Sequence, residues 1–167
     1  MYIKGAVVGK ESYIHILIES LEKKSQVLDD IAKCDAEQKA IISAKEPDLK
    51  QLENNIDKVG MLAERVEKLN EGFETVYEKV RQELQDNKTE HRAEIKRMQE
   101  LIREVTEKTV RIEAEENRNK VAVTQLLRNQ RKAISERRRS LSAMNKYSNT
   151  MRGINTMDSS YFMDKKK

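Results

Sequence analysis

The residues best suited to chemistry are two histidines, His15 and His91, and a single cysteine, Cys34. An imidazole or a thiolate can bind a metal ion or take part in catalysis, but only with partner side chains at a suitable spacing. Neither histidine has a cysteine or carboxylate at a recognised ligand spacing, and one cysteine cannot form an internal disulfide. The sequence therefore predicts no metal site.

Recognised catalytic motifs are also missing from the sequence. It has no glycine-rich phosphate loop, no serine nucleophile elbow and no paired-cysteine motif. A di-iron site in a helical bundle would need inward glutamates and repeated Glu-x-x-His, which the sequence lacks. We therefore expect a protein that is not an enzyme and that carries no cofactor.

The composition indicates long helices rather than a wide core. Of the 167 residues, 37% are charged and only 4% are aromatic, with one proline and no tryptophan. These proportions are typical of coiled coils and long helices. A seam between helices needs only about two or three apolar residues in seven.

Charge and cysteine use bear on the compartment. The net charge is +4, from 33 basic and 29 acidic residues, which does not by itself indicate nucleic-acid binding. A lone cysteine is typical of a reducing compartment. The N-terminal apolar stretch is too short for a signal peptide, and no run of about 18 apolar residues occurs. We expect a cytoplasmic protein without membrane insertion.

Three stretches repeat apolar residues every three or four positions, the spacing of one helix face. The first stripe contains Ile14, Leu17, Leu21, Leu28, Ile31 and Ile42. The second contains Leu49, Leu52, Ile56, Val59, Ala63, Val66, Phe73, Tyr77, Val80 and Leu84. The third contains Ile95, Met98, Ile102, Val105, Ile112, Val123, Leu126, Leu127 and Ile134. Lys24, Asp35 and Gln38 interrupt the first stripe, so we expect its far half to be poorly sealed.

Turn-forming residues separate these stripes. Ser12 is a candidate N-cap, Pro47 suits the first turn of a new helix, and "QDNKTEH" at 85–91 favours a turn. We predict an all-α fold, a long antiparallel three-helix bundle or coiled-coil hairpin. The alternative is an extended coiled-coil dimer, but Pro47 and the turn residues favour the hairpin. The predicted parts are a flexible arm at 1–11, a bundle at 12–144 with helices at about 12–44, 47–86 and 90–144 (the third extended), and a flexible tail at 145–167.

A basic cluster, "RNQRKAISERRR", covers 128–139. It could dock an acidic partner or nucleic acid. It could equally be a solvated face near a helix C-terminus, where cations complement the helix dipole. We favour the solvated face, and the lack of interleaved aromatic residues argues further against nucleic-acid binding.

Polar and apolar residues near the C-terminus are candidates for partner binding. Asn117 and Asn119 interrupt the third stripe, as either a weak point in the helix or a polar pair beside a groove. The tail keeps apolar residues among Ser, Thr and Asn. It is a segment that folds on binding, a segment that covers an apolar groove until a partner arrives, or a disordered terminus with incidental apolar residues. The tail residues singled out are Tyr147, Met151, Tyr161 and Phe162.

Two stretches of the sequence resemble FlgN-type flagellar export chaperones. The first helical hairpin of that family is similar to "YIHILIESLEKKSQVLDDIAKCDAEQKAI" followed by "LKQLENNIDKVGMLAERVEKLNEGFETVYEKV". Its last helix is similar to "MQELIREVTEKTVRIEAEENRNKVAVTQLL", in which the Asn-containing "ENRNKV" precedes an apolar run. The resemblance covers roughly residues 10–135 and is one of layout and heptad texture. The long third helix, its basic end and the tail "SSYFMDKKK" depart from the family pattern.

The resemblance implies a cytoplasmic chaperone that binds a helical terminus of hook–filament junction (hook-associated) proteins, prevents their premature assembly and delivers them to the export apparatus. Alone, such a protein would be a monomer or weak homodimer. The alternatives are a structural homodimeric coiled-coil scaffold and, less favoured, a nucleic-acid binder. Carried onto this sequence with the residues singled out above, the implied partner-binding residues are Asn117, Asn119, Val121, Val123, Leu126, Leu127, Ile134, Tyr147, Met151, Tyr161 and Phe162.

Overall fold

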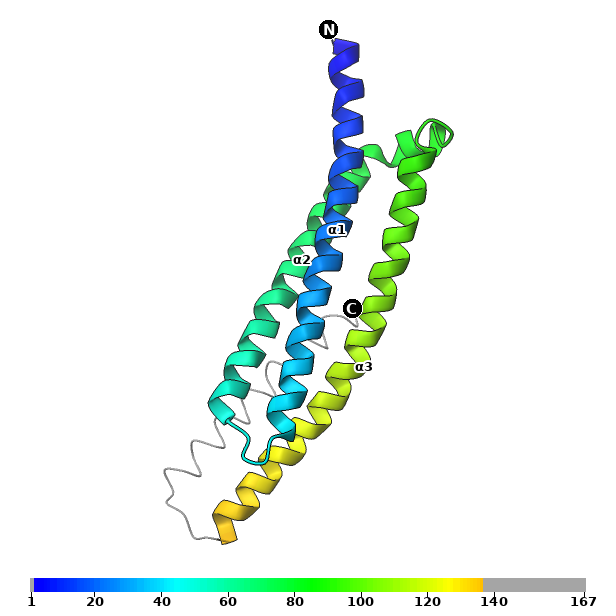
Figure 1. Ribbon diagram of the computed structural model, residues 1–167. Coiled ribbons are helices and arrows are strands. Elements are labelled where there is room, and N and C mark those ends of the chain that lie inside the picture. The colour runs from blue at the N-terminus through cyan, green and yellow to red at the C-terminus, as the bar shows by residue number, and fades with distance from the viewer. Residues whose placement is uncertain (1, 137–167) are drawn as a thin grey trace. The chain divides into compact units, whose positions relative to one another are not determined.

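The structure, a computed structural model, describes the backbone of residues 2–136 and the side chains of 9–133. This part of the chain folds into three α-helices: α1 (Tyr2–Ser43), α2 (Leu49–Asp86) and α3 (Arg92–Glu136) (Figure 1). Between residues 2 and 136 there is no strand. The prediction of an all-α bundle of three long helices is therefore confirmed.

The helices build two compact units. The first unit is Met1–Asp30 with Glu64–Arg111, and the second is Ile31–Ala63 with Ile112–Lys167, of which 112–136 is described. Each helix contributes one section to each unit. The connection from α1 to α2 lies in the second unit, and the connection from α2 to α3 lies in the first.

Contacts in the first unit show that α1 and α2 are antiparallel. Lys10 of α1 pairs with Glu83 of α2 at 3.1 Å. Ten residues later in α1, the Ser20 hydroxyl donates to the Leu69 carbonyl at 3.4 Å. The contact position moves forward along α1 and backward along α2, as in a helical hairpin. This confirms that α1 and α2 form a hairpin within one chain.

In the same unit α3 runs parallel to α1. Arg97 of α3 lies 3.4 Å from Glu22. Further along both helices, the Lys108 ammonium lies 2.9 Å from Asp29 and 3.3 Å from Glu104. Burial alone would lower the pKa of Lys108, but its hydrogen bonds to these two carboxylates outweigh burial and raise it. Lys108 is therefore charged and ties α3 to α1.

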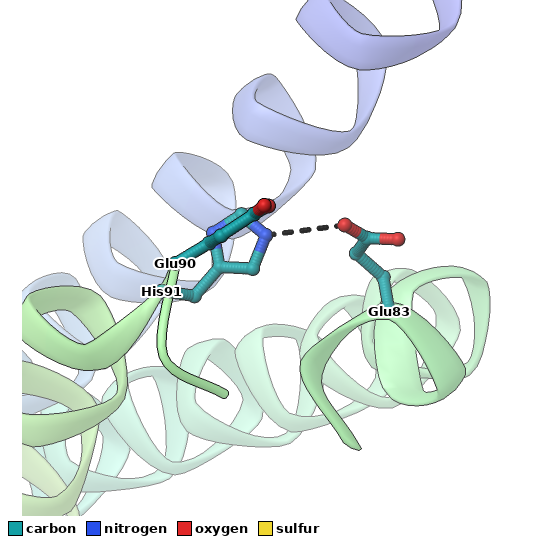
Figure 2. A group of neighbouring side chains, drawn as sticks. All are labelled: Glu83, Glu90 and His91. Carbon is teal, nitrogen blue, oxygen red and sulfur yellow. Dashed lines mark hydrogen bonds and ion pairs between the residues drawn. The ribbon is translucent and has the colours of Figure 1, made fainter. Parts of the chain in front are cut away.

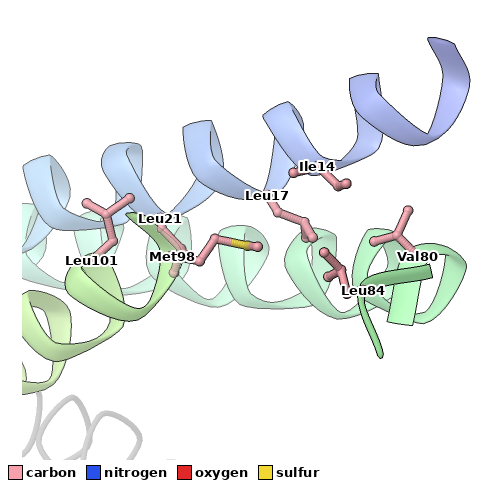
Figure 3. Close-up of a cluster of buried hydrophobic side chains, with 7 residues drawn as sticks. All are labelled: Ile14, Leu17, Leu21, Val80, Leu84, Met98 and Leu101. Carbon is pink, nitrogen blue, oxygen red and sulfur yellow. The ribbon is translucent and has the colours of Figure 1, made fainter. Parts of the chain in front are cut away.

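A small apolar cluster forms the core of the first unit (Figure 3). All three helices supply it, because each carries apolar residues at a spacing of three or four. Burying one such side chain stabilises the fold by about 1.5–3 kcal/mol. The cluster consists of Ile14, Leu17, Leu21, Val80, Leu84, Met98 and Leu101.

The third apolar stripe differs from the prediction by one residue. Leu101 is 1% exposed, whereas Ile102, which we placed in the stripe, is 48% exposed. The buried positions Met98, Leu101 and Val105 keep the spacing of three and four. Ile102 is about 100° further round the helix than Leu101, and it faces solvent.

A second apolar cluster closes the second unit near the α1–α2 connection. Ile41 of α1, Leu52 of α2, and Val123 and Leu127 of α3 are buried in it. The partly buried side chains around it are Ile42, Leu49, Ile56 and Leu126. In the first stripe the buried residue is thus Ile41, with Ile42 at the edge.

The α1–α2 corner lies at the predicted place with different cap chemistry. α1 ends at Ser43, close to the predicted residue 44. Asp48 is the N-cap of α2, because its Oδ1 accepts from the main-chain N–H of Lys50 at 3.0 Å and of Gln51 at 3.2 Å. Pro47 therefore precedes the cap and does not occupy the first helical turn.

The second predicted turn is confirmed. α2 ends at Asp86, a turn covers 87–91, and α3 begins at Arg92. The predicted third helix reached residue 144. Its described part ends at Glu136, and 137–144 lie outside the described residues.

The predicted arm at 1–11 is helical from Tyr2 onward, and Ser12 lies inside α1 rather than at its N-cap. No proline interrupts this stretch. Two glycines cost only about 1 kcal/mol each in a helix. The helix that packs at Ile14 therefore continues toward the N-terminus.

Across the described residues, no helix combines the length and the apolar character needed to cross a membrane.

Candidate functional site

The predicted partner-binding residues of α3 divide into two groups. Asn117 is exposed, and Val121 is 71% exposed. Asn119, Val123 and Leu127 are each 3% exposed and lie inside the second unit. Among the predicted residues whose side chains the structure describes, only Asn117 and Val121 are exposed.

The remaining predicted residues are less accessible or lie outside the described part. Leu126 is partly buried against the second apolar cluster. Ile134 belongs to α3, but its side chain lies outside the described residues, as do Tyr147, Met151, Tyr161 and Phe162. Their proposed contacts stay predictions.

Two asparagines hold the interior of the second unit together. Asn55 of α2 donates from Nδ2 to the Cys34 carbonyl of α1 at 2.9 Å. Asn119 of α3 donates from Nδ2 to the next carbonyl, that of Asp35, also at 2.9 Å. Side chains of α2 and α3 thus bind adjacent main-chain oxygens of α1.

These bonds are possible because a carbonyl oxygen has two lone pairs. Inside a helix one lone pair accepts the N–H of the residue four positions later, and the other stays available. An asparagine can reach it only if the helices pack closely and at a defined register. Asn119 is therefore a structural residue, and α3 continues as one helix through Asn117 and Asn119, so it has no weak point there.

Other polar side chains surround these bonds. Gln38 of α1 donates from Nε2 to Asn55 Oδ1 at 3.0 Å, so the Asn55 side chain is bonded through both its amide atoms. Two acidic residues are also buried, Asp35 at 1% and Glu116 at 6% exposure. The predicted gap at Asp35 and Gln38 is thus filled by a polar layer rather than left open to solvent.

A charged group lies at the edge of this layer. Arg118 donates from Nε to Glu115 Oε2 at 3.1 Å, and Lys39 of α1 lies 4.0 Å from Glu115 Oε1. The hydrogen bond from Arg118 lowers the pKa of Glu115 and outweighs the opposing effect of burial, with the charges of Arg118 and Lys39 adding to it. This exposed group adds little to stability, since surface ion pairs contribute about 0–1 kcal/mol.

The last described turns of α3 continue beyond the α1–α2 connection (Figure 1). Leu127 is the last α3 residue in the second apolar cluster. After it come mostly exposed polar residues: Arg128, Asn129, Arg131 and Lys132. This part of the basic cluster is exposed, which fits both interpretations of the cluster, and the rest of the cluster lies outside the described side chains.

A separate polar group forms at the α2–α3 corner of the first unit, centred on Glu83 (Figure 2). Glu83 Oε1 accepts from Asn87 Nδ2 at 2.9 Å and lies 3.3 Å from His91 Nε2. Glu83 Oε2 accepts from Lys10 Nζ at 3.1 Å. The hydrogen bonds from Asn87, Lys10 and His91, in that order, lower the pKa of Glu83.

One further carboxylate joins this corner. Each of Glu83, Glu90 and His91 offers one potential metal-ligand atom, and these atoms lie within 4.8 Å of one another. The sequence spacing did not indicate the group, because Glu83 and His91 are eight residues apart across a turn. The turn residues at 85–91 could have indicated this group, because a tight turn brings the residues after it back to the end of the preceding helix.

Comparison with known protein families, with curated proteins and with solved structures finds no match to this chain. The resemblance to FlgN-type chaperones therefore stays a prediction from the sequence.

Replacing Asn55 tests the polar layer. Asn55→Ala removes the bond to the Cys34 carbonyl and leaves the buried Gln38 amide without its acceptor. We expect the free energy of unfolding to fall by about 1–3 kcal/mol, as for other buried polar groups that lose a partner. Chemical denaturation measures the change.

The neighbouring Asn54→Ala is the matched control, because Asn54 is exposed on the same helix. Both variants gain the same helix propensity from alanine, about 0.7 kcal/mol at most. Equal unfolding free energies for the two variants would contradict the role assigned to Asn55.

The corner of the first unit makes a pH prediction. The ordinary pKa of a glutamate is 4.5, and that of Glu83 is lower when the chain is folded. A lowered carboxyl pKa stabilises the fold above the unfolded value, and this contribution is lost as the pH falls through the folded value. We expect Glu83→Gln to lower the urea midpoint at about pH 7, and the difference from wild type to shrink below about pH 4.5.

Glu74→Gln is the control, since Glu74 is an exposed residue of the same helix. If the urea midpoints of wild type and Glu83→Gln differed by the same amount at about pH 7 and below about pH 4.5, the stabilising role assigned to the Glu83 carboxylate would be contradicted.

Proposed function

We propose that the protein is a non-catalytic binding protein, an export chaperone of the FlgN type, that holds a helical segment of a flagellar hook–filament junction protein. Two things support the proposal. One is the resemblance of residues 10–135 to that family. The other is the form of α3, because no other described helix covers the face of its second-unit section that carries Val121.

The observation that carries the proposal is the exposure of Val121. Its side chain is 71% exposed on α3, while Val123, two residues on, is 3% exposed. The two point to different sides of the helix, so α3 packs its own core with one face and leaves the other open. An isolated exposed valine is ordinary on a protein surface, and its neighbours decide whether it can belong to a binding face.

Those neighbours share the face of Val121. Asn117, Val121 and Arg128 are spaced by four and seven residues, which puts them in one row along α3. Asn117 and Arg128 are also exposed. A partner helix lying along this row would meet one apolar and two polar side chains and would not require the bundle to open.

The buried predicted residues have a different part in this proposal. Val123 and Leu127 pack against Ile41 and Leu52 and hold α3 in place. They support the binding face from behind and do not touch the partner. Among the described side chains, the proposed contact residues are therefore Asn117 and Val121 from the predicted set, together with Arg128. The contacts predicted for Ile134, Tyr147, Met151, Tyr161 and Phe162 lie outside the described side chains and stay predictions.

The chaperone proposal includes its setting. The protein would act in the cytoplasm, bind one client helix per chain and pass the client to the export apparatus. It would be a monomer or weak dimer when alone, and nucleic acid has no part in this function.

A charged residue at the centre of the proposed face tests it. We expect Val121→Asp to weaken binding to the helical terminus of a junction protein by about tenfold or more, which corresponds to about 1.4 kcal/mol. Isothermal titration calorimetry with purified junction proteins measures the affinity. The stability of the variant should match wild type, because the side chain is already exposed.

Met61→Asp is the matched control, because Met61 is 72% exposed in the same unit but belongs to α2. Equal losses in the two variants would contradict the assigned face. If the wild-type protein bound no junction protein and stayed dimeric at every concentration in light scattering, the structural coiled-coil alternative would be favoured instead.

A further inference from the structure

We propose that the α2–α3 corner is a binding site for a divalent transition-metal ion of the zinc type, with Glu83, Glu90 and His91 as its protein ligands. The site lies in the first unit and does not depend on the proposed chaperone function. It uses one imidazole nitrogen and two carboxylate oxygens, a donor set that zinc accepts.

The separation of the two inner donors fits a shared ion. Zinc binds nitrogen at about 2.0–2.1 Å and oxygen at about 2.0–2.2 Å, so two donors at a tetrahedral angle lie about 3.4 Å apart. His91 Nε2 and Glu83 Oε1 are 3.3 Å apart. In the absence of metal this distance is a weak hydrogen bond, and an ion could take the place of the shared proton without a large movement.

Both inner ligands are held in position before any ion binds. The side chains of His91 and Glu83 are only 11% and 18% exposed. Glu83 is also fixed by Asn87 on Oε1 and by Lys10 on Oε2. The second lone pair of Oε1 can accept a metal while Asn87 keeps its bond, and partners of this kind usually orient a ligand and strengthen metal binding.

Glu90 supplies the third donor from the solvent side. It is exposed, and in Figure 2 its carboxylate lies beside the His91 ring on the side of Glu83. Its oxygen is within 4.8 Å of the other two donor atoms. In the proposed site this exposed side chain rotates until its oxygen reaches ligand distance, and water completes four-coordination.

The charges at the corner favour a cation only in part. Two carboxylates near one imidazole attract a divalent ion, while the Lys10 ammonium opposes it. Lys10 bonds to Glu83 Oε2, whereas His91 lies against the other oxygen, Oε1. A metal ion bound to Oε1 therefore need not displace Lys10. The lowered pKa of Glu83 keeps that ligand deprotonated near neutral pH.

The test is a titration of the full-length protein, without a polyhistidine tag, with Zn²⁺ by calorimetry and with Co²⁺ by visible absorption. We expect saturable one-to-one binding and a rise in the melting temperature with added Zn²⁺, because a ligand specific to the folded state stabilises it. Mg²⁺ and Ca²⁺ should not compete, because an imidazole-containing site favours transition metals.

Two variants identify the ligands. His91→Ala should abolish one-to-one binding, and Glu90→Gln should weaken it by about tenfold or more, by analogy with the loss seen when even outer partners of a metal are removed. Glu90→Gln changes an exposed side chain, so it keeps the test valid if His91→Ala fails to fold. The controls are His15→Ala, which removes the other, exposed histidine, and Glu74→Gln.

Unchanged Zn²⁺ affinity in Glu90→Gln and His91→Ala would overturn the proposal. Loss of binding in His15→Ala, or no saturable binding by the wild-type protein at micromolar Zn²⁺, would overturn it as well.

Discussion

Two hydrogen bonds from asparagine side chains to adjacent carbonyl oxygens of α1 set the geometry of the second unit. Asn55 comes from α2 and Asn119 from α3, and they reach the carbonyls of Cys34 and Asp35. An apolar side chain can slide along a groove with little penalty, but a buried amide is satisfied at one register only. A polar residue at such a position is known to specify register and partner number in coiled coils.

The outward face of α3 follows from this register. Once Asn119 points to α1, helical geometry turns Val123 and Leu127 inward and Val121 outward. The same bonds therefore determine which residues build the core and which remain for a partner. The proposed client face depends on the buried asparagine, although Asn119 itself would never touch the client. At the other corner, Glu83 has a comparable local role, since Asn87, His91 and Lys10 all converge on it.

Helix number, the two turns and most of the buried stripe could be predicted from the sequence, because periodicity and turn-forming residues act locally. Leu17, Leu52 and Val105 are buried as their spacing indicated. The sequence could not decide whether Leu101 or Ile102 is buried. The two are adjacent and both apolar, so the buried one is decided by the side of α3 that the neighbouring helices cover. The roles of Asn119, Asp48 and His91 depend on the particular atom to which each side chain bonds. The spacing of residues along the chain does not reveal these partner atoms.

The most direct test of the register claim is a two-dimensional amide NMR spectrum of Asn55→Leu/Asn119→Leu. Leucine has as many side-chain heavy atoms as asparagine and replaces a buried amide by apolar contact, so the variant should remain helical. It should be less stable than wild type, because the buried Gln38 amide loses its acceptor. We predict that peaks from the second unit broaden or split, because α2 and α3 then sample more than one register against α1. A single sharp set of peaks, with the wild-type pattern outside the two substituted sites, would contradict the account.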